Sequence, residues 1–387
     1  MNCSEFAQLP VLDSHIHYGH PSFMPGLMDI LDNLCVDRLN VVCTPHQTRL
    51  SLVPDALHLK AHFPDRVYVF GGMDISALFI APEQAGAVFA DYVDTLLNLG
   101  CDGVKMIEGK PEMRKMLPIP PFDSEVYAPY WARLAERGTP VIFHVNDPEE
   151  FWDRARIPDW AREQGWFYGD GSFIDNEAQY AEVLNVLERH PDLKVVFAHF
   201  FFLSAQLPRL ADILDRFPNV CVDLTPGIEM YYNFSAAPDA ARAFFLKYQD
   251  RIVYGTDIGA KALLVAPGQG IEADESRSRV ELVRTFLEKE GEFGLPAGGG
   301  FLFGEQEPPL RGIALPRPVL EKIYSGNFER MAGDRPRDLN PAAIVAECER
   351  LTMMIGMVGA AQPGVAGDPS VAQMVKSFFE PGVERET

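Results

Sequence analysis

The sequence predicts an α/β protein, a (β/α)8 barrel with long βα loops and a C-terminal helical extension. Short β-rich runs alternate with longer helical segments along the 387 residues, a pattern typical of repeated βαβ units and a parallel sheet. Eight such runs can be counted, and eight parallel strands close a barrel. Five of the apolar runs also carry, at their ends, a side chain that can bind a metal. Because the carboxyl ends of barrel strands meet on one face, such ligands can surround a single ion.

The predicted strands are separated by amphipathic helices. In one of these helices Tyr180, Val183 and Leu187 fall on one face, as expected of a helix that covers a barrel strand. This helix is expected to end at His190, because proline, which follows it, disfavours the helical conformation in the residue before it. The strands are expected at residues 11–17, 39–44, 67–73, 103–108, 140–145, 194–199, 220–225 and 251–256.

One large barrel domain fits the length and the composition. With 47% hydrophobic residues the chain can bury a substantial interior, and α/β barrels commonly exceed the usual domain size. We expect the barrel to span residues 1–335. The remaining residues, 336–387, are expected to form a helical extension that packs on the barrel or on a partner subunit of a homo-oligomer.

Charge and cysteine usage limit the partners and the compartment. A net charge of −21 repels nucleic acid and anionic lipid surfaces, so neither is expected as a partner. The apolar stretch 351–366 is interrupted by Gly, Gln and Pro and is too short to span a bilayer. The six cysteines form no Cys-x-x-Cys pair and are predicted to be reduced core thiols. The chain is therefore predicted to be cytoplasmic.

Two regions exceed a minimal barrel. Residues 147–174 follow the fifth strand and hold three of the four tryptophans, so this loop is expected either to roof the site or to pack on itself around a small core of its own. Residues 258–317 include the glycine cluster 298–300. This cluster lacks the spacing of a phosphate-binding loop and predicts a plain flexible loop.

The His-x-His pair at the end of the first strand indicates a metal site. Side chains alternate faces along a strand, so His15 and His17 point to the same side and can bind one ion together. A third imidazole and a carboxylate would complete a site for Zn²⁺ or a similar divalent ion, with one position open for water. His144 and Asp257, each at the end of a later strand, are the candidates.

The spread of histidines and one aspartate over strands one, five, six and eight resembles the amidohydrolase superfamily. Within it, the stretches 103–111 (GVKMIEGKP) and 144–152 (HVNDPEEFW) are most similar to an uncharacterised subgroup of the amidohydrolase-related branch, which includes aminocarboxymuconate semialdehyde decarboxylase. The resemblance covers the whole predicted barrel. It implies that one divalent metal, preferably Zn²⁺, is bound by His15, His17, His144 and Asp257.

The resemblance also implies catalytic roles. His199 would stay off the metal and hydrogen-bond the water or polarise a substrate oxygen, while Asp257 would accept the proton of that water. General chemistry supports this proton transfer. A bound metal lowers the pKa of water from about 15.7 to about 7, so a neighbouring carboxylate or imidazole can take the proton near neutral pH. His199 could instead be a structural histidine that closes its strand.

Lys105, on the fourth strand, has two interpretations. In binuclear members of the superfamily a lysine at this place is carboxylated and bridges two metals, whereas in the amidohydrolase-related branch it more often stays an amine. We favour the free amine, which could hold a substrate carboxylate by its charge. Glu108 could be a further ligand or the ion-pair partner of Lys105.

The leading functional hypothesis is a metal-dependent hydrolase in which activated water attacks a carbonyl of a small molecule, such as an amide or a lactone. The alternative is a metal-dependent non-oxidative decarboxylase of an aromatic or enol carboxylic acid. A third interpretation is a non-catalytic barrel that binds a ligand or a metal. It is weakened because every expected metal-binding and proton-transfer position is filled.

Overall fold

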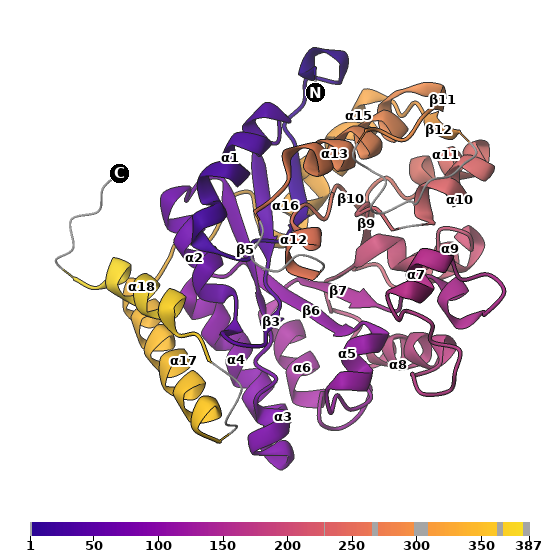
Figure 1. Ribbon diagram of the computed structural model, residues 1–387. Helices are drawn as coiled ribbons and strands as arrows, with labels where there is room; N and C mark the ends of the chain where they lie inside the picture. Colours follow the sequence, from indigo (N-terminus) through magenta and orange to yellow (C-terminus); the bar gives the residue numbers. More distant parts are fainter. Residues whose placement is uncertain (1, 228, 265–269, 298–308, 362–366, 382–387) are drawn as a thin grey trace.

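The computed structural model describes residues 2–227, 229–264, 270–297, 309–361 and 367–381, and its centre is a parallel sheet of eight strands (Figure 1). Strands that follow one another in the sheet also follow one another along the chain, in the order β1-β2-β5-β6-β7-β8-β9-β10. The predicted (β/α)8 barrel is confirmed. The strands span Leu12–Ile16 (β1), Arg38–Val42 (β2), Val67–Gly72 (β5), Gly103–Gly109 (β6), Val141–Val145 (β7), Val195–Phe197 (β8), Val220–Asp223 (β9) and Ile252–Val253 (β10).

The first and last strands meet and close the barrel. Ser14 N donates to Tyr254 O at 3.0 Å, Asp257 N donates to His15 O at 2.9 Å, and His17 N donates to Ile258 O at 2.8 Å. Each bond joins β1 to the segment that follows β10. This seam therefore brings the His-x-His pair next to Asp257.

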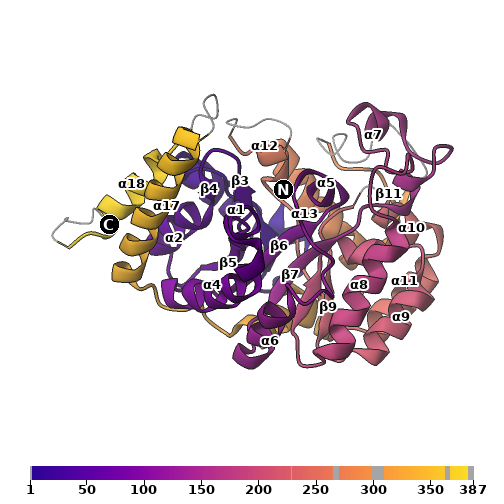
Figure 2. The same ribbon diagram turned by 90° about the horizontal axis from the view of Figure 1, so that it is seen from below.

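Helices surround the sheet on its outer side, as Figures 1 and 2 show. Their buried residues pack with the outward side chains of the strands in one large hydrophobic cluster. The helices span Met24–Asn33 (α1), Val53–His62 (α2), Ala77–Ile80 (α3), Ala85–Leu99 (α4), Pro111–Met116 (α5), Ala128–Arg137 (α6), Asp159–Glu163 (α7), Asn176–Arg189 (α8), Leu207–Arg216 (α9), Met230–Ala236 (α10), Pro238–Lys247 (α11), Ala260–Leu264 (α12), Ala273–Glu288 (α13), Arg317–Glu321 (α15), Asn327–Ala332 (α16), Pro341–Ala361 (α17) and Ser370–Phe379 (α18).

A second hydrophobic cluster fills the inside of the barrel. It joins side chains of seven strands with Phe328 and Met331 of α16. The ring of Phe328 packs on Tyr68 and Phe70 of β5, and Glu329 forms an ion pair with Arg38, the first residue of β2. Helix α16 therefore plugs the amino-terminal end of the barrel and leaves polar chemistry to the opposite end.

The C-terminal residues form two helices that lie side by side on the barrel (Figures 1 and 2). Helix α17 contacts α4, and α18 contacts α2. Among the described residues, every helix is too short or too polar to span a bilayer. The division of the chain at residue 335 stays a prediction.

The two long insertions differ from each other. Residues 147–174 pack on themselves, with Phe151, Ile157, Ala161 and Tyr168 at the centre of a small separate core. The other insertion contributes α12, α13 and an antiparallel pair of strands, Glu290–Phe293 (β11) and Leu310–Ile313 (β12). The short strands Pro45–His46 (β3) and Leu50–Ser51 (β4) form a further pair. The glycine cluster 298–300 lies outside the described residues.

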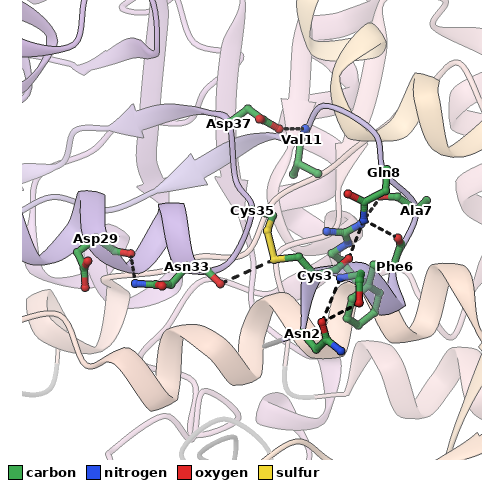
Figure 3. The surroundings of a disulfide bond; sticks show 12 residues. Asn2, Cys3, Phe6, Ala7, Gln8, Val11, Asp29, Asn33, Cys35 and Asp37 are labelled. Carbon is green, nitrogen blue, oxygen red and sulfur yellow. Dashed lines mark hydrogen bonds between the residues drawn. A yellow bond between two sulfur atoms is a disulfide. The ribbon is translucent and has the colours of Figure 1, made fainter.

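The prediction that all six cysteines are reduced is wrong for two of them. Cys3 and Cys35 form a disulfide that ties the N-terminal segment to the end of α1 (Figure 3). Local sequence could not reveal this pair, because the two residues lie 32 positions apart and meet only through the fold. The other four cysteines are free and buried. Disulfides are uncommon in reducing compartments, so a cytoplasmic location stays a prediction.

Candidate metal centre

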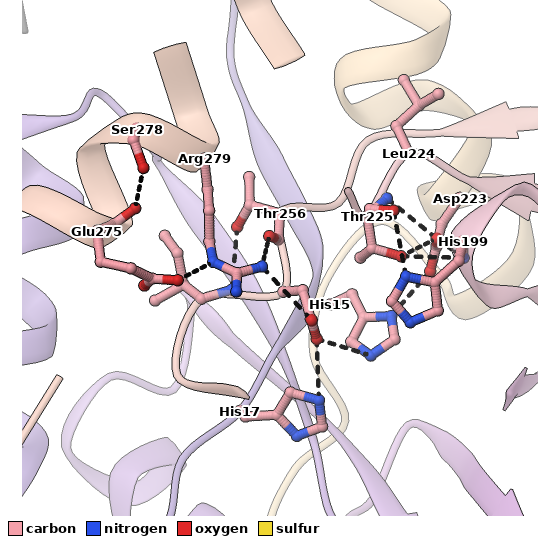
Figure 4. Close-up of polar contacts among 12 residues, drawn as sticks. His15, His17, His199, Asp223, Leu224, Thr225, Thr256, Glu275, Ser278 and Arg279 are labelled. Carbon is pink, nitrogen blue, oxygen red and sulfur yellow. Dashed lines mark hydrogen bonds and ion pairs between the residues drawn. The ribbon is translucent and has the colours of Figure 1, made fainter. Parts of the chain in front are cut away.

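Three ligand atoms converge at the carboxyl ends of β1 and β10. The Nε2 atom of His17 lies 3.1 Å from Oδ1 of Asp257, and Nε2 of His15 lies 3.7 Å from the same oxygen. All three ligand atoms lie within 4.8 Å of one another, and all three residues are buried. Figure 4 shows the rings of His15 and His17 on the same side of their strand. The predicted pairing of the His-x-His motif with Asp257 is thus present in the structure.

Asp223, the last residue of β9, orients the first histidine. Its Oδ2 lies 2.8 Å from Nδ1 of His15 (Figure 4), and this contact leaves Nε2 of His15 to face Asp257. Its Oδ1 accepts a hydrogen bond from the backbone N of His199 at 2.8 Å. Burial opposes the ionisation of Asp223, but the hydrogen bond with His15 keeps its pKa below the usual value. A carboxylate that fixes the tautomer of a ligand histidine is a common support of metal sites.

His199 lies beside the three ligands on a strained backbone. Its φ of 54° and that of Asp257, 64°, fall in the left-handed region, which non-glycine residues seldom adopt away from functional sites. The ring of His199 lies 6.0 Å from that of His15 and 4.9 Å from that of His144, measured between centroids. Burial, followed by the neighbouring His144, lowers the pKa of His199 to about 3. His199 is therefore a neutral imidazole at neutral pH.

His144 lies near this group but faces a different partner. Its Nε2 atom lies 3.4 Å from Oδ1 of Asp147, and burial lowers its pKa. The other oxygen of Asp147 accepts hydrogen bonds from Lys110 at 2.8 Å and from Tyr168 at 2.7 Å. The self-packed loop thus aims a fixed carboxylate at His144. Within the described residues, the compact ligand group contains His15, His17 and Asp257, and His144 lies outside it.

Lys105 is buried against the same centre. Its Nζ atom lies 3.2 Å from Nε2 of His15, and burial lowers its pKa to about 8. Neither side-chain oxygen of Glu108 has a hydrogen-bond partner among the described residues, and burial raises its pKa to about 7. The structure therefore shows Glu108 neither in the compact ligand group nor hydrogen-bonded to Lys105.

Sequence reasoning missed two residues of this centre: Asp223 and Arg279, whose Nη1 lies 3.4 Å from Oδ2 of Asp257. A signal for Asp223 exists, because it is an acidic residue within the otherwise apolar run of the seventh predicted strand. Arg279 carries no such signal, because it lies in the middle of α13 and is distant in sequence from the predicted strand ends.

Comparisons with known proteins agree with this geometry. The family model described as amidohydrolase matches residues 74–331, which is more than half of the 387-residue chain. The chain belongs to the amidohydrolase family. The resemblance noted from the strand-end motifs is confirmed, although the matched range begins after His15 and His17. No curated protein sequence matches this amidohydrolase.

Solved structures share the fold at low sequence identity. The crystal structure of 2,6-dihydroxybenzoate decarboxylase from Rhizobium has a TM-score of 0.51 at 12% identity, over 84% of this chain and 98% of that one. A putative amidohydrolase from Staphylococcus aureus has a TM-score of 0.51 at 14% identity, over 84% of this chain and 100% of that one. At such identity the likeness establishes the fold of this amidohydrolase alone.

Proposed function

We propose that this amidohydrolase is a metal-dependent hydrolase of small molecules and that His15, His17 and Asp257 hold its ion. The observation that carries the proposal is the convergence of two imidazole nitrogens and one carboxylate oxygen within 4.8 Å at the open end of the barrel. His144, near the end of β7, is proposed as the fourth ligand. The active-site face of such barrels is the carboxyl end of the strands, where these residues lie.

The residues fit a divalent ion. Imidazole and carboxylate ligands suit Zn²⁺ and several neighbouring transition metals, so we propose Zn²⁺ as the preferred ion and one ion per chain. Burial and the nearby Lys105 lower the pKa of His15 to about 4, so its ring is neutral and can ligate at neutral pH. A second ion would need Lys105 to be carboxylated. We propose a free amine instead, because Nζ of Lys105 lies within hydrogen-bonding distance of His15 Nε2, at 3.2 Å.

The neighbouring side chains supply the remaining chemistry. An ion bound here would lower the pKa of a water molecule towards 7. Asp257 stays ionised, because His17 and Arg279 outweigh the effect of burial on its pKa, and it can therefore accept a proton. Neutral His199 can donate a hydrogen bond to a substrate oxygen. Lys105 can attract a substrate carboxylate, because its buried amine lies 3.2 Å from Nε2 of His15.

A decarboxylase of an aromatic or enol acid is the second candidate, and Lys105 favours it. A buried amine beside the ligand group suits a substrate that carries a carboxylate. The Rhizobium protein of similar fold is a 2,6-dihydroxybenzoate decarboxylase, which illustrates such chemistry on this scaffold without assigning it to this chain.

Metal analysis and a parallel substrate screen test the proposal. Purified protein should contain one divalent ion per chain, and the ion should be lost in His15→Ala and His17→Ala. His58→Ala is the control, because His58 is also buried but lies on the outer helix α2. Lactones, amides and aromatic acids are then assayed with CO₂ detection. A wild-type protein that binds no divalent metal contradicts the proposal, and CO₂ release without hydrolysis favours the second candidate.

A further inference from the structure

We propose that Arg279 is a positioning residue that holds Asp257 with a single carboxylate oxygen directed at the two histidines. The inference rests on the proposed metal site and adds to it a residue from the helix layer. Arg279 lies on α13, outside the strand ends that supply the ligands (Figure 4).

The two oxygens of Asp257 have different partners. Oδ1 faces Nε2 of His17 at 3.1 Å and Nε2 of His15 at 3.7 Å. Oδ2 accepts a hydrogen bond from Nη1 of Arg279 at 3.4 Å. With Oδ2 held in this way, only Oδ1 is presented to an ion between the histidines.

Arg279 is itself held in place. Its Nη1 donates to the carbonyl oxygen of Thr256 at 3.0 Å, and its Nε donates to Glu275 at 2.5 Å. Figure 4 shows the guanidinium between Glu275 and Thr256. The side chain is only 1% exposed. A planar guanidinium fixed at two edges can hold a third group in one orientation, which a flexible ammonium cannot do.

Stability alone does not explain this arginine. Its Nη2 is buried and has no hydrogen-bond partner among the described residues. Burying a guanidinium is costly unless its hydrogen bonds are satisfied, and here one donor group goes unused. The arrangement is reasonable if the orientation of Asp257 is what the residue provides.

The backbone of Asp257 is held from the opposite side. Its N donates to the carbonyl oxygen of His15 at 2.9 Å, and its φ of 64° is left-handed. The strained backbone turns the side chain towards the histidines, and Arg279 then fixes the rotation of the carboxylate. β1 and α13 thus position one ligand together.

The same helix offers a matched control. Arg284 also lies on α13 and is 2% exposed, and its Nε donates to Glu288 at 3.0 Å, with the same four-residue spacing as Arg279 and Glu275. Its Nη2 donates to the carbonyl oxygen of Ala7 at 2.8 Å rather than to the metal centre. Arg284→Lys therefore measures what loss of a buried guanidinium from α13 does to the fold.

The test compares the Zn²⁺ affinity of Arg279→Lys, Arg284→Lys and wild type by competition with a coloured chelator, with the thermal midpoint of the metal-free proteins measured alongside. Lysine keeps the charge but has one nitrogen, which cannot take the positions of both Nε and Nη1. We expect Arg279→Lys to bind Zn²⁺ about 10-fold to 100-fold more weakly and Arg284→Lys to bind it as the wild type does.

Each result has a definite meaning. An Arg279→Lys affinity equal to or tighter than that of the wild type overturns the inference while leaving the proposed function intact. A wild-type protein that binds no Zn²⁺ or other divalent ion overturns both. If Arg279→Lys does not fold, Glu275→Ala takes its place, because it removes the oxygen that accepts from Nε and should weaken Zn²⁺ binding several-fold. Unchanged affinity in that variant also overturns the inference.

Discussion

Replacing Asp223 by asparagine is expected to weaken metal binding by changing the tautomer of His15. Oδ1 of Asp223 accepts from the backbone N of His199 and from both the backbone N and the hydroxyl of Thr225, so the amide oxygen of asparagine must take that place. The amide NH₂ then faces Nδ1 of His15, 2.8 Å from the present oxygen position. Because NH₂ can only donate, Nδ1 must become the acceptor and the proton moves to Nε2, the nitrogen that faces Asp257.

The expected size of this effect follows from the role of Asp223. Loss of a carboxylate that supports a ligand histidine typically lowers metal affinity about 10-fold to 100-fold, which corresponds to about 1.4 to 2.8 kcal/mol. Chelator competition for Zn²⁺ measures it directly. Asp102→Asn is the control, because Asp102 is also buried and accepts hydrogen bonds from backbone N–H groups, but it lies just before β6, at the amino-terminal end of that strand. Equal Zn²⁺ affinity of Asp223→Asn and Asp102→Asn would falsify the tautomer argument.

Four further outcomes are expected. His199→Asn should keep its metal and lower turnover by about 100-fold or more. Asp257→Asn should keep much of its metal yet lose nearly all turnover. Metal analysis and rate measurements on the active substrate test both. Glu108→Gln should unfold at higher urea than the wild type at pH 8 but not below pH 4.5. Burial raises the pKa of Glu108 from 4.5 to about 7. As the pH rises from 4.5 to 7, Glu108 ionises in the unfolded wild type before it does in the folded protein, so the free energy of unfolding falls by up to about 3 kcal/mol. Cys3→Ser should lower the free energy of unfolding by about 3 to 4 kcal/mol, because the disulfide closes a loop across a separation of 32 residues. The wild type with its disulfide reduced is the control and should lose a similar free energy of unfolding. Free thiols at both Cys3 and Cys35 in the unreduced protein would contradict this expectation.

Much of the fold could be predicted because strand patterns are local. All eight predicted strands occur, and the larger differences lie at their carboxyl ends. The sixth predicted strand, 194–199, ends as β8 at Phe197, since residues 199 to 202 all have positive φ. The eighth, 251–256, is shortened to Ile252–Val253 before the left-handed Asp257. These ends bend out of regular strand geometry where they carry His199 and Asp257, which periodicity cannot reveal.

The candidate site could be predicted in part. Residue type and spacing identified His15 and His17, and the end of the last predicted strand identified Asp257. The contacts of Asp223 and Arg279 depend on which side chains the closed barrel brings together, and a single sequence holds no record of them. Likewise, the sequence offered no means to expect that Asp147, three residues after His144, would be fixed by Lys110 and Tyr168 and directed at that ring.

The metal centre and the closure of the barrel coincide. Asp13 accepts hydrogen bonds from the backbone N and the hydroxyl of Thr256, 243 positions away along the chain. His15 and His17 lie on one side of this seam and Asp257 lies on the other, so the ligand group is complete only when β1 and the segment after β10 are joined. An ion bound there binds only the closed barrel and therefore stabilises the closure, since a ligand of the folded state alone shifts the equilibrium towards that state. The site is thus a property of the closed barrel rather than of any one segment.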